Sequence, residues 1–225
     1  MQIRGVLLDF YGTVVDEDDD VLRGICEEIA TESNHSAQAI GDLWEREYEH
    51  ATKGSTGSGF ESQREISAST LSRVLRSIQS DRDAEELCEP QFRHWRSAAL
   101  RAGSQEFLAA CELPVCVVSN IDRDDIEAAI DHHRLVLPNL VTSDDVGAYK
   151  PHRAMFDAGL AVLGLAPGEV LHIGDSLSAD VTGANALGIS VAWVNRRSRS
   201  APASAQIDYE VIDLREILPA LVQVS

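Results

Sequence analysis

The run Ile3-Arg4-Gly5-Val6-Leu7-Leu8-Asp9-Phe10-Tyr11-Gly12-Thr13 is a short apolar segment that ends in an aspartate and a Gly-Thr turn. Its nearly continuous apolar character predicts a strand that is buried on both faces, as in a parallel sheet. Such strands end at the carboxyl edge of the sheet, where α/β proteins bind their ligands. We therefore expect Asp9 to point its carboxylate out of this edge, although an isolated aspartate at this spacing more often only caps its own turn.

Three later segments favour the functional interpretation of Asp9. They are Ser119-Asn120 after one β-type run, Lys150-Pro151 before a helix, and Gly174-Asp175 with Asp180 after another β-type run. Each is ambiguous alone: Ser119 is also a suitable helix N-cap, and Asp180 suits a helix start because of the dipole. Because parallel strands end at one edge, these segments together predict a single crevice.

The residue types in this crevice suit attack by an aspartate on an anionic substrate beside a divalent cation. The Lys150 ammonium would offset the repulsion between Asp9 and an incoming anion. The Ser119 hydroxyl would donate to a phosphoryl or carboxylate oxygen. Magnesium prefers hard oxygen ligands, which Asp9 and Asp175 supply, and Asp180 would orient waters or the lysine.

The pattern along the chain divides it into two parts. Helical periodicity dominates residues 16–87, whereas helix and strand alternate from about residue 88 onward. We predict an α/β fold: a three-layer, Rossmann-like parallel-sheet core over 1–15 and 88–225, with an inserted all-helical domain over 16–87. The expected strands cover 3–8, 114–118, 140–142, 170–173, 189–194 and 209–212. The expected core helices cover 105–111, 124–132, 152–163, 180–187 and a closing segment from 214.

Composition limits the possible partners. The formal net charge of −18 argues against nucleic acid, whose phosphates need a basic surface. No run reaches the roughly 18 to 20 apolar residues that a membrane span requires. The first residues lack the layout of a signal peptide, and the four cysteines have no metal-type spacing. We expect a cytoplasmic protein with a small anionic substrate, and the oligomeric state stays open.

The four segments, in this order, resemble the motifs of the haloacid dehalogenase-like (HAD) hydrolases, most of which are phosphatases. The resemblance implies that Asp9 is the nucleophile and that the Thr13 hydroxyl helps to hold its carboxylate and loop. It also implies that Thr13, Asn120 and Tyr11 contact the substrate. The Mg²⁺ ligands would come from Asp9, Asp175 and the Tyr11 backbone carbonyl, with Asp180 nearby.

By the same resemblance, the helical insert is a cap that closes over the site and recognises the leaving group. The run Gly54-Ser55-Thr56-Gly57-Ser58-Gly59 lies within it. Its composition suits either a lid loop near the substrate or a loose connection between cap helices.

Tyr11 departs from the phosphatase pattern, which has an acid/base aspartate two residues after the nucleophile. A phenol with a pKa of about 10 is a poor proton donor and base at neutral pH, and losing a general acid/base costs about 100- to 10,000-fold in rate. Tyrosine at this position resembles the 2-haloacid dehalogenases. Those metal-independent enzymes, however, have Ser and Asn where this chain has Asp175 and Leu177. They also have a cap arginine near this chain's Glu45 and Arg46, and a tyrosine at the position of Phe156.

The sequence thus predicts a Mg²⁺-dependent phosphatase acting on a small phosphorylated metabolite through an aspartyl-phosphate on Asp9. Because of Tyr11, we expect low activity on simple alkyl phosphates. One alternative is a metal-independent 2-haloacid dehalogenase with the same nucleophile. Another is a non-catalytic binding protein with the HAD fold.

Overall fold

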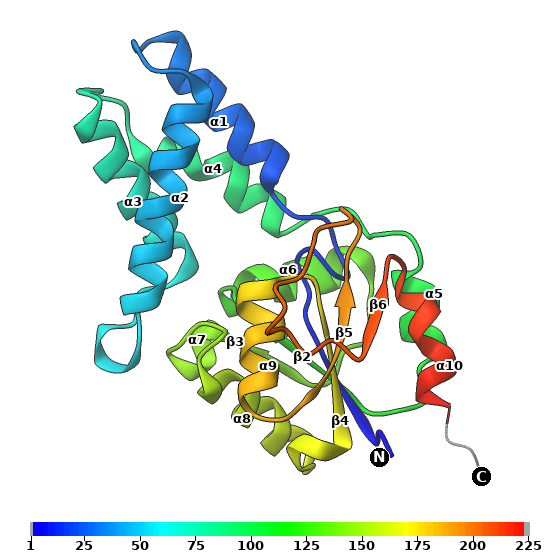
Figure 1. Cartoon of the computed structure of the whole chain (residues 1–225). Helices are drawn as coiled ribbons and strands as arrows, with labels where there is room; N and C mark the ends of the chain where they lie inside the picture. Colours follow the sequence, from blue (N-terminus) through cyan, green and yellow to red (C-terminus); the bar gives the residue numbers. More distant parts are fainter. Residues whose placement is uncertain (1, 223–225) are drawn as a thin grey trace.

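A computed structural model describes residues 2–222, with a parallel sheet at their centre (Figure 1). Within these residues the sheet has six strands in the order β3-β2-β1-β4-β5-β6. The strands are β1 (Gly5–Leu8), β2 (Val115–Ser119), β3 (Leu140–Thr142), β4 (Val170–Gly174), β5 (Ser190–Val194) and β6 (Tyr209–Val211). Leu8 lies between Val117 of β2 and Ile173 of β4 in parallel register. The residues that follow these three strands therefore emerge at the same edge.

Helices cover both faces of the sheet, so the predicted three-layer core is confirmed. Alternate side chains of β1 separate the two layers: Val6 and Leu8 pack on one side, and Leu7 packs on the other. The first side is covered by α5 (Ser104–Ala110), α6 (Arg123–His133), η4 (Leu214–Ile217) and α10 (Leu218–Leu221). The second is covered by α8 (Arg153–Leu163), η3 (Leu177–Val181) and α9 (Thr182–Ala186). The short elements α7 (Ser143–Val146) and η2 (Pro167–Glu169) complete the core.

The segment between β1 and β2 contributes a helical unit, as predicted. Its elements are α1 (Asp19–Thr31), α2 (Ala37–Gly54), η1 (Gly57–Gly59), α3 (Gln63–Ser77) and α4 (Ala84–Trp95). Figure 1 shows this group set apart from the core, beyond the end of the sheet toward which β5 points. Helix α3 begins with a capping box: the Ser62 side chain accepts a hydrogen bond from Glu65 N, and the Glu65 carboxylate accepts one from Ser62 N.

Helix α4 continues through position 88, where the predicted domain boundary lies. It packs against α3 and α1. We therefore propose that the helical unit extends to Trp95 and that the core resumes after it. Pro90 lies inside α4, close to the predicted change of pattern at about residue 88. Pro90 is the seventh residue of α4, past the first turn, so its missing N–H removes the intrahelical hydrogen bond to Glu86 O.

Two predicted helices are less regular than expected. The segment predicted as one helix over 180–187 begins as the π-helix η3, capped by the Ser176 side chain, and continues as α9. The closing segment begins as a 3-10 turn and becomes α-helical only at Leu218. Pro219 has no N–H to donate four residues back, so a regular helix cannot run through this point unbroken.

Among residues 2–222, no helix is both long enough and apolar enough to cross a membrane.

Candidate active site

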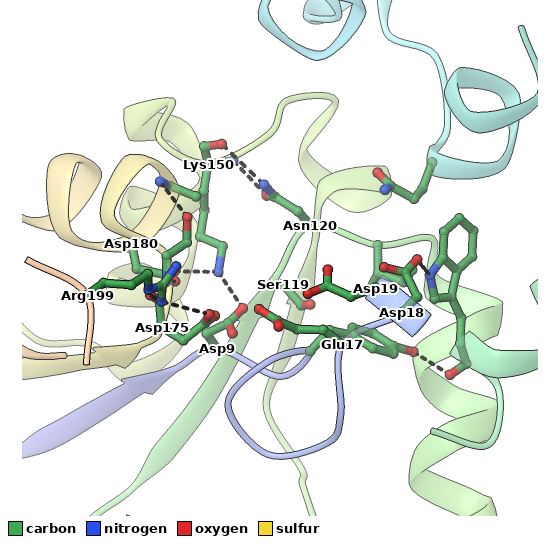
Figure 2. A pocket seen from close by; sticks show the side chains of 16 residues that line it. Asp9, Glu17, Asp18, Asp19, Ser119, Asn120, Lys150, Asp175, Asp180 and Arg199 are labelled. Atoms are coloured by element: carbon green, nitrogen blue, oxygen red, sulfur yellow. Dashed lines mark hydrogen bonds and ion pairs between the residues drawn. The ribbon is translucent and has the colours of Figure 1, made fainter. Parts of the chain in front are cut away.

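The predicted segments meet in one cavity of about 310 Å³ at the carboxyl edge of the sheet (Figure 2). Asp9 follows β1, Ser119 ends β2, and Asp175 follows β4. All predicted site residues except Thr13 line this cavity. Three strand ends therefore place groups from distant parts of the chain together, as the parallel topology requires.

Lys150 lies between two carboxylates at the centre of the site. Its Nζ donates to Asp9 Oδ1 and to Asp180 Oδ1, at 2.7 Å in each case (Figure 2). Burial by itself lowers the pKa of Lys150, but the charges of Asp180 and Asp9 outweigh it and the net pKa is raised. For Asp180, burial raises the pKa, yet Lys150 and His172 hold it well below its ordinary value. Lys150 and Asp180 thus form a charged pair that holds one oxygen of Asp9.

Asp9, Asp175 and Asp180 form a buried carboxylate cluster whose ligand atoms lie within 4.8 Å of one another. Burial and repulsion from Asp9 and Asp180 raise the pKa of Asp175 to about 9. Asp9 Oδ2 is buried and has no hydrogen-bond partner among the described residues. Clustered hard oxygens with excess negative charge suit a small divalent cation, so these residues fit Mg²⁺.

Asn120 contacts the backbone that carries the lysine. Its Oδ1 accepts from Lys150 N at 2.7 Å, and its Nδ2 donates to Lys150 O at 3.2 Å. Its amide therefore holds Lys150 in place, and the predicted substrate contact stays a prediction. Ser119 is buried and lines the cavity. Thr13 is fully buried, and its hydroxyl has no partner among residues 2–222.

The Tyr11 hydroxyl donates to the Trp95 backbone carbonyl at 2.7 Å, at the end of helix α4. Burial raises the pKa of Tyr11 further above its ordinary value. Tyr11 therefore links the loop after β1 to helix α4 and is poorly suited to proton transfer. The prediction that its backbone carbonyl binds Mg²⁺ remains untested.

Sequence reasoning missed an arginine loop after β5, formed by residues 195–199. Arg196 donates to the backbone carbonyls of Gly12 and Thr13 at 3.0 and 3.2 Å. Arg199 donates to Asp175 O at 2.6 Å and lines the cavity. The signal was present as three arginines within four residues after a strand, in a chain with only 19 lysines and arginines. Lys150 and Arg199 are the basic residues that line a cavity otherwise rich in carboxylates.

Two further residues of the sheet support the acidic cluster. His172 of β4 is fully buried, and its Nε2 lies 2.9 Å from Asp180 Oδ1. Trp193 Nε1 donates to Asp175 O at 2.8 Å. These interactions orient Asp180 and Asp175, and the apolar strands around them gave no sign of such a role.

The helical unit is docked on the core by acidic residues of the segment that begins α6. The Asp122 carboxylate accepts from Gln63 N at 2.7 Å and from Arg64 N at 3.1 Å, at the start of α3. The Arg64 guanidinium binds both oxygens of the buried Asp125, at 2.7 and 2.6 Å. These contacts hold α3 against the rim of the cavity.

The Gly/Ser run predicted as a lid or a loose connection lies against the loop before Lys150. Gly57 N donates to Gly147 O at 2.9 Å, and the rings of Phe60 and Tyr149 stack with centroids 5.2 Å apart. Residues 54–59 do not line the catalytic cavity. The run thus serves as a second docking point between the helical unit and the core.

Comparison with known proteins agrees with this architecture. Residues 3–188 match the family model of the haloacid dehalogenase-like hydrolases. The chain is 34% identical over 146 residues to a phosphoserine phosphatase of Thermus thermophilus, a match that covers 61% of this chain and 57% of that protein. It is 24% identical to (S)-2-haloacid dehalogenase 4A of Burkholderia cepacia, across 98% of this chain and 96% of that one. The structure of the L-2-haloacid dehalogenase RSc1362 aligns with a TM-score of 0.81 at 18% identity, covering 98% of this chain and 99% of that chain. The family match spans the strands that carry Asp9, Ser119 and Asp175, and by it the chain belongs to the haloacid dehalogenase-like hydrolases.

Proposed function

We propose that this hydrolase is a Mg²⁺-dependent phosphatase that transfers the phosphoryl group of a small phosphate monoester to Asp9 and then to water. The observation that carries the proposal is the buried cluster of Asp9, Asp175 and Asp180. Without a cation, Lys150 is shared between Asp9 and Asp180, and Asp175 must hold a proton because its pKa is raised to about 9. Such a site has little positive charge to offer the carboxylate of a haloacid. A bound divalent cation would neutralise this cluster and stabilise negative charge on the transferring phosphoryl group.

The two oxygens of Asp9 have different surroundings. Oδ1 accepts from Lys150, whereas Oδ2 has no partner among the described residues. Oδ2 is therefore the oxygen that attacks phosphorus, forming an aspartyl-phosphate as the bond to the leaving alkoxide breaks. Lys150 offsets the repulsion between this carboxylate and the dianion, and Ser119 donates to a phosphoryl oxygen. Water then cleaves the acyl phosphate, which restores Asp9 and releases phosphate.

Protonation of the leaving group is the weak step. The Tyr11 hydroxyl already donates to Trp95 O, and its raised pKa makes it a reluctant acid. Substrates whose leaving groups need no proton, such as aryl phosphates, should therefore react faster than simple alkyl phosphates.

A metal-independent 2-haloacid dehalogenase is the second candidate. Tyr11 and the relative that matches nearly the whole chain favour it, and the comparisons alone support it at least as well as the phosphatase. The side chains counter this: Arg46 is exposed on α2 and does not line the catalytic cavity, and Phe156 is buried against His172. Glu17, Asp18 and Asp19 add carboxylates to the cavity wall.

Parallel assays of phosphate and halide release separate the candidates. Wild type and Asp9→Asn are incubated with an aryl phosphate, a panel of phosphorylated metabolites and 2-chloropropionate, each with Mg²⁺ or EDTA. Phosphate release that needs both Mg²⁺ and Asp9 supports the proposal. Halide release that persists in EDTA replaces it with the dehalogenase. If neither product forms above the Asp9→Asn control, the non-catalytic alternative is favoured.

A further inference from the structure

Arg199 places a positive charge at the edge of the acidic cluster. Its Nη2 donates to Asp175 O at 2.6 Å and lies 3.4 Å from Asp175 Oδ2 (Figure 2). Lys150 and Arg199 both line the catalytic cavity, but Lys150 already donates to Asp9 and Asp180. Arg199 is therefore the cation paired with Asp175, and the proposed chemistry gives it no role.

The fold holds Arg199 in this place through its backbone and its side chain. Asn195 is buried, and its Oδ1 accepts from Arg199 N at 2.8 Å while its Nδ2 donates to Arg199 O at 2.9 Å. The same Nδ2 donates to Glu210 of β6 at 2.6 Å, so the amide is itself tied to the sheet. The Arg199 side chain is 36% exposed, and its Cζ lies over the Trp193 ring, 5.7 Å from the centroid. Arg199 cannot move far without breaking these contacts.

Arg199 lies on the Asp175 side of the site, away from the groups expected to contact the phosphoryl oxygens. It follows β5, which pairs with β4, whereas Ser119 ends β2 on the other side of β1. Figure 2 shows Arg199 and Ser119 on opposite sides of Asp9. Arg199 is therefore placed to act through the charge of the metal site, without direct contact with the transferring phosphoryl group.

The charge of Arg199 acts in opposite directions on a metal ion and on a phosphate. Lys150 and Asp180 form a pair whose charges cancel, which leaves Asp9 and Asp175 as the carboxylates that Mg²⁺ would neutralise. With Arg199 beside them, these carboxylates attract Mg²⁺ less strongly, because like charges repel. When Mg²⁺ is bound, the charge of Arg199 is no longer offset by these two carboxylates, and it attracts an incoming dianion.

The other carboxylates of the cavity wall do not alter this direction. Glu17 and Asp19 both pair with Arg197, and Asp18 accepts hydrogen bonds from side chains of α4. They contribute the same charge whether or not Arg199 is present. They therefore affect the total charge of the cavity, but not the difference that Arg199 makes.

We infer that Arg199 is a specificity-determining residue that lowers the affinity of the site for Mg²⁺ and raises the affinity of the Mg²⁺-loaded site for the phosphate dianion of the substrate. This inference rests on the proposed function, because it requires both Mg²⁺ and a phosphate ligand. Arg199 acts by its charge beside Asp175, from a loop that lies outside the four segments in which we predicted the site.

Calorimetric titrations of wild type and Arg199→Gln measure both affinities without turnover. Mg²⁺ is titrated into metal-free protein, and inorganic phosphate is titrated into protein saturated with Mg²⁺, both at pH 8, where phosphate is mainly a dianion. For Arg199→Gln we expect Mg²⁺ to bind at least about threefold more tightly and phosphate to bind at least about threefold more weakly.

Two further variants test whether the charge is responsible. Arg199→Lys keeps the positive charge and should lie closer to wild type than to Arg199→Gln in both titrations. Arg153→Gln makes the same charge change at an exposed position of α8, where the arginine pairs with Asp157, and should leave both affinities unchanged. A loss of structure in Arg199→Gln would weaken the binding of both ligands, whereas the inference requires tighter binding of Mg²⁺.

The outcomes separate this inference from the proposed function. If wild type binds Mg²⁺ and hydrolyses an aryl phosphate, but Arg199→Gln binds Mg²⁺ no more tightly or phosphate no more weakly than wild type, the inference is overturned and the phosphatase stands. If wild type binds no Mg²⁺ and releases no phosphate, the proposed function fails and the inference fails with it.

Discussion

Replacing Asp175 by asparagine should change how the stability of the metal-free protein depends on pH. Burial and the charges of Asp9 and Asp180 raise the pKa of the Asp175 carboxyl from 3.8 to about 9. Asparagine preserves the size of the side chain and removes its titration. The substitution therefore measures how much the buried charge of Asp175 lowers the stability of the metal-free protein, in the acidic cluster that we propose binds Mg²⁺.

The sign and size follow from proton linkage. Between about pH 5 and pH 8, the folded protein holds a proton at Asp175 that the unfolded chain has released. Stability therefore falls as pH rises through this window, by about 1.4 kcal/mol per pH unit for one group. From pH 6 to pH 8 the loss is about 2.7 kcal/mol, which lowers Tm by roughly 5 to 10 °C in a chain of this size. The Asp175→Asn variant should not show this loss of stability between pH 6 and pH 8.

Scanning calorimetry in EDTA at pH 6, 7 and 8 measures the difference between wild type and Asp175→Asn. Mg²⁺ at 100 times its Kd should stabilise wild type by about 2.7 kcal/mol. At one fixed Mg²⁺ concentration the stabilisation should be larger at pH 8 than at pH 6, because binding must displace the proton from Asp175. Asp175→Asn should show little of this stabilisation. Parallel pH profiles for the two proteins in EDTA would refute the reasoning, since they would mean that Asp175 titrates normally.

Three further variants test the site and its attachment to the cap. Lys150→Met should abolish activity and lower the free energy of unfolding by about 3 to 5 kcal/mol, because the two carboxylates that Lys150 contacts lose their counter-charge. Urea unfolding followed by circular dichroism measures the loss of stability, and an unchanged unfolding midpoint would contradict the prediction. Asp122→Ala should cost about 1 kcal/mol and raise KM, because the start of α3 loses its acceptor, whereas exposed Asp124→Ala should leave KM unchanged. Tyr11→Asp should raise kcat on alkyl phosphates by up to about 100-fold, because it supplies the general acid. Tyr11→Asn is the control, since asparagine has the shape of aspartate without a carboxyl proton to transfer. Equal kcat values for the two variants would count against a missing general acid.

Local sequence patterns predicted the core of the site because its groups stand at strand ends. Asp9, Ser119 and Asp175 each follow an apolar run, and parallel pairing through β1 brings the three ends together. Lys150 was recognisable because an ammonium is needed to offset the repulsion between Asp9 and an incoming anion. Short-range hydrophobic patterns indicate where each strand ends, and the parallel arrangement then places those ends at one edge.

Contacts between distant side chains were not predictable in this way. Nothing near Tyr11 shows that its hydroxyl reaches Trp95 O, 84 positions away. The arginine loop bonds to the nucleophile loop across more than 180 positions. Such interactions depend on how the loops and helices pack, so no local pattern in the sequence encodes them.

The sequence by itself predicted the parallel sheet, the helical insert and the convergence of Asp9, Ser119, Lys150 and Asp175, because strand periodicity is a local property of the chain and parallel strands end at one edge of their sheet. Only the tertiary structure decided that Tyr11 is tied to the cap, and that Gln63, Ser67 and Gln91 line one cavity. The physical reason is that a cavity between helices exists only once helices from separate segments have packed, and the free energy of that packing is shared over many long-range contacts.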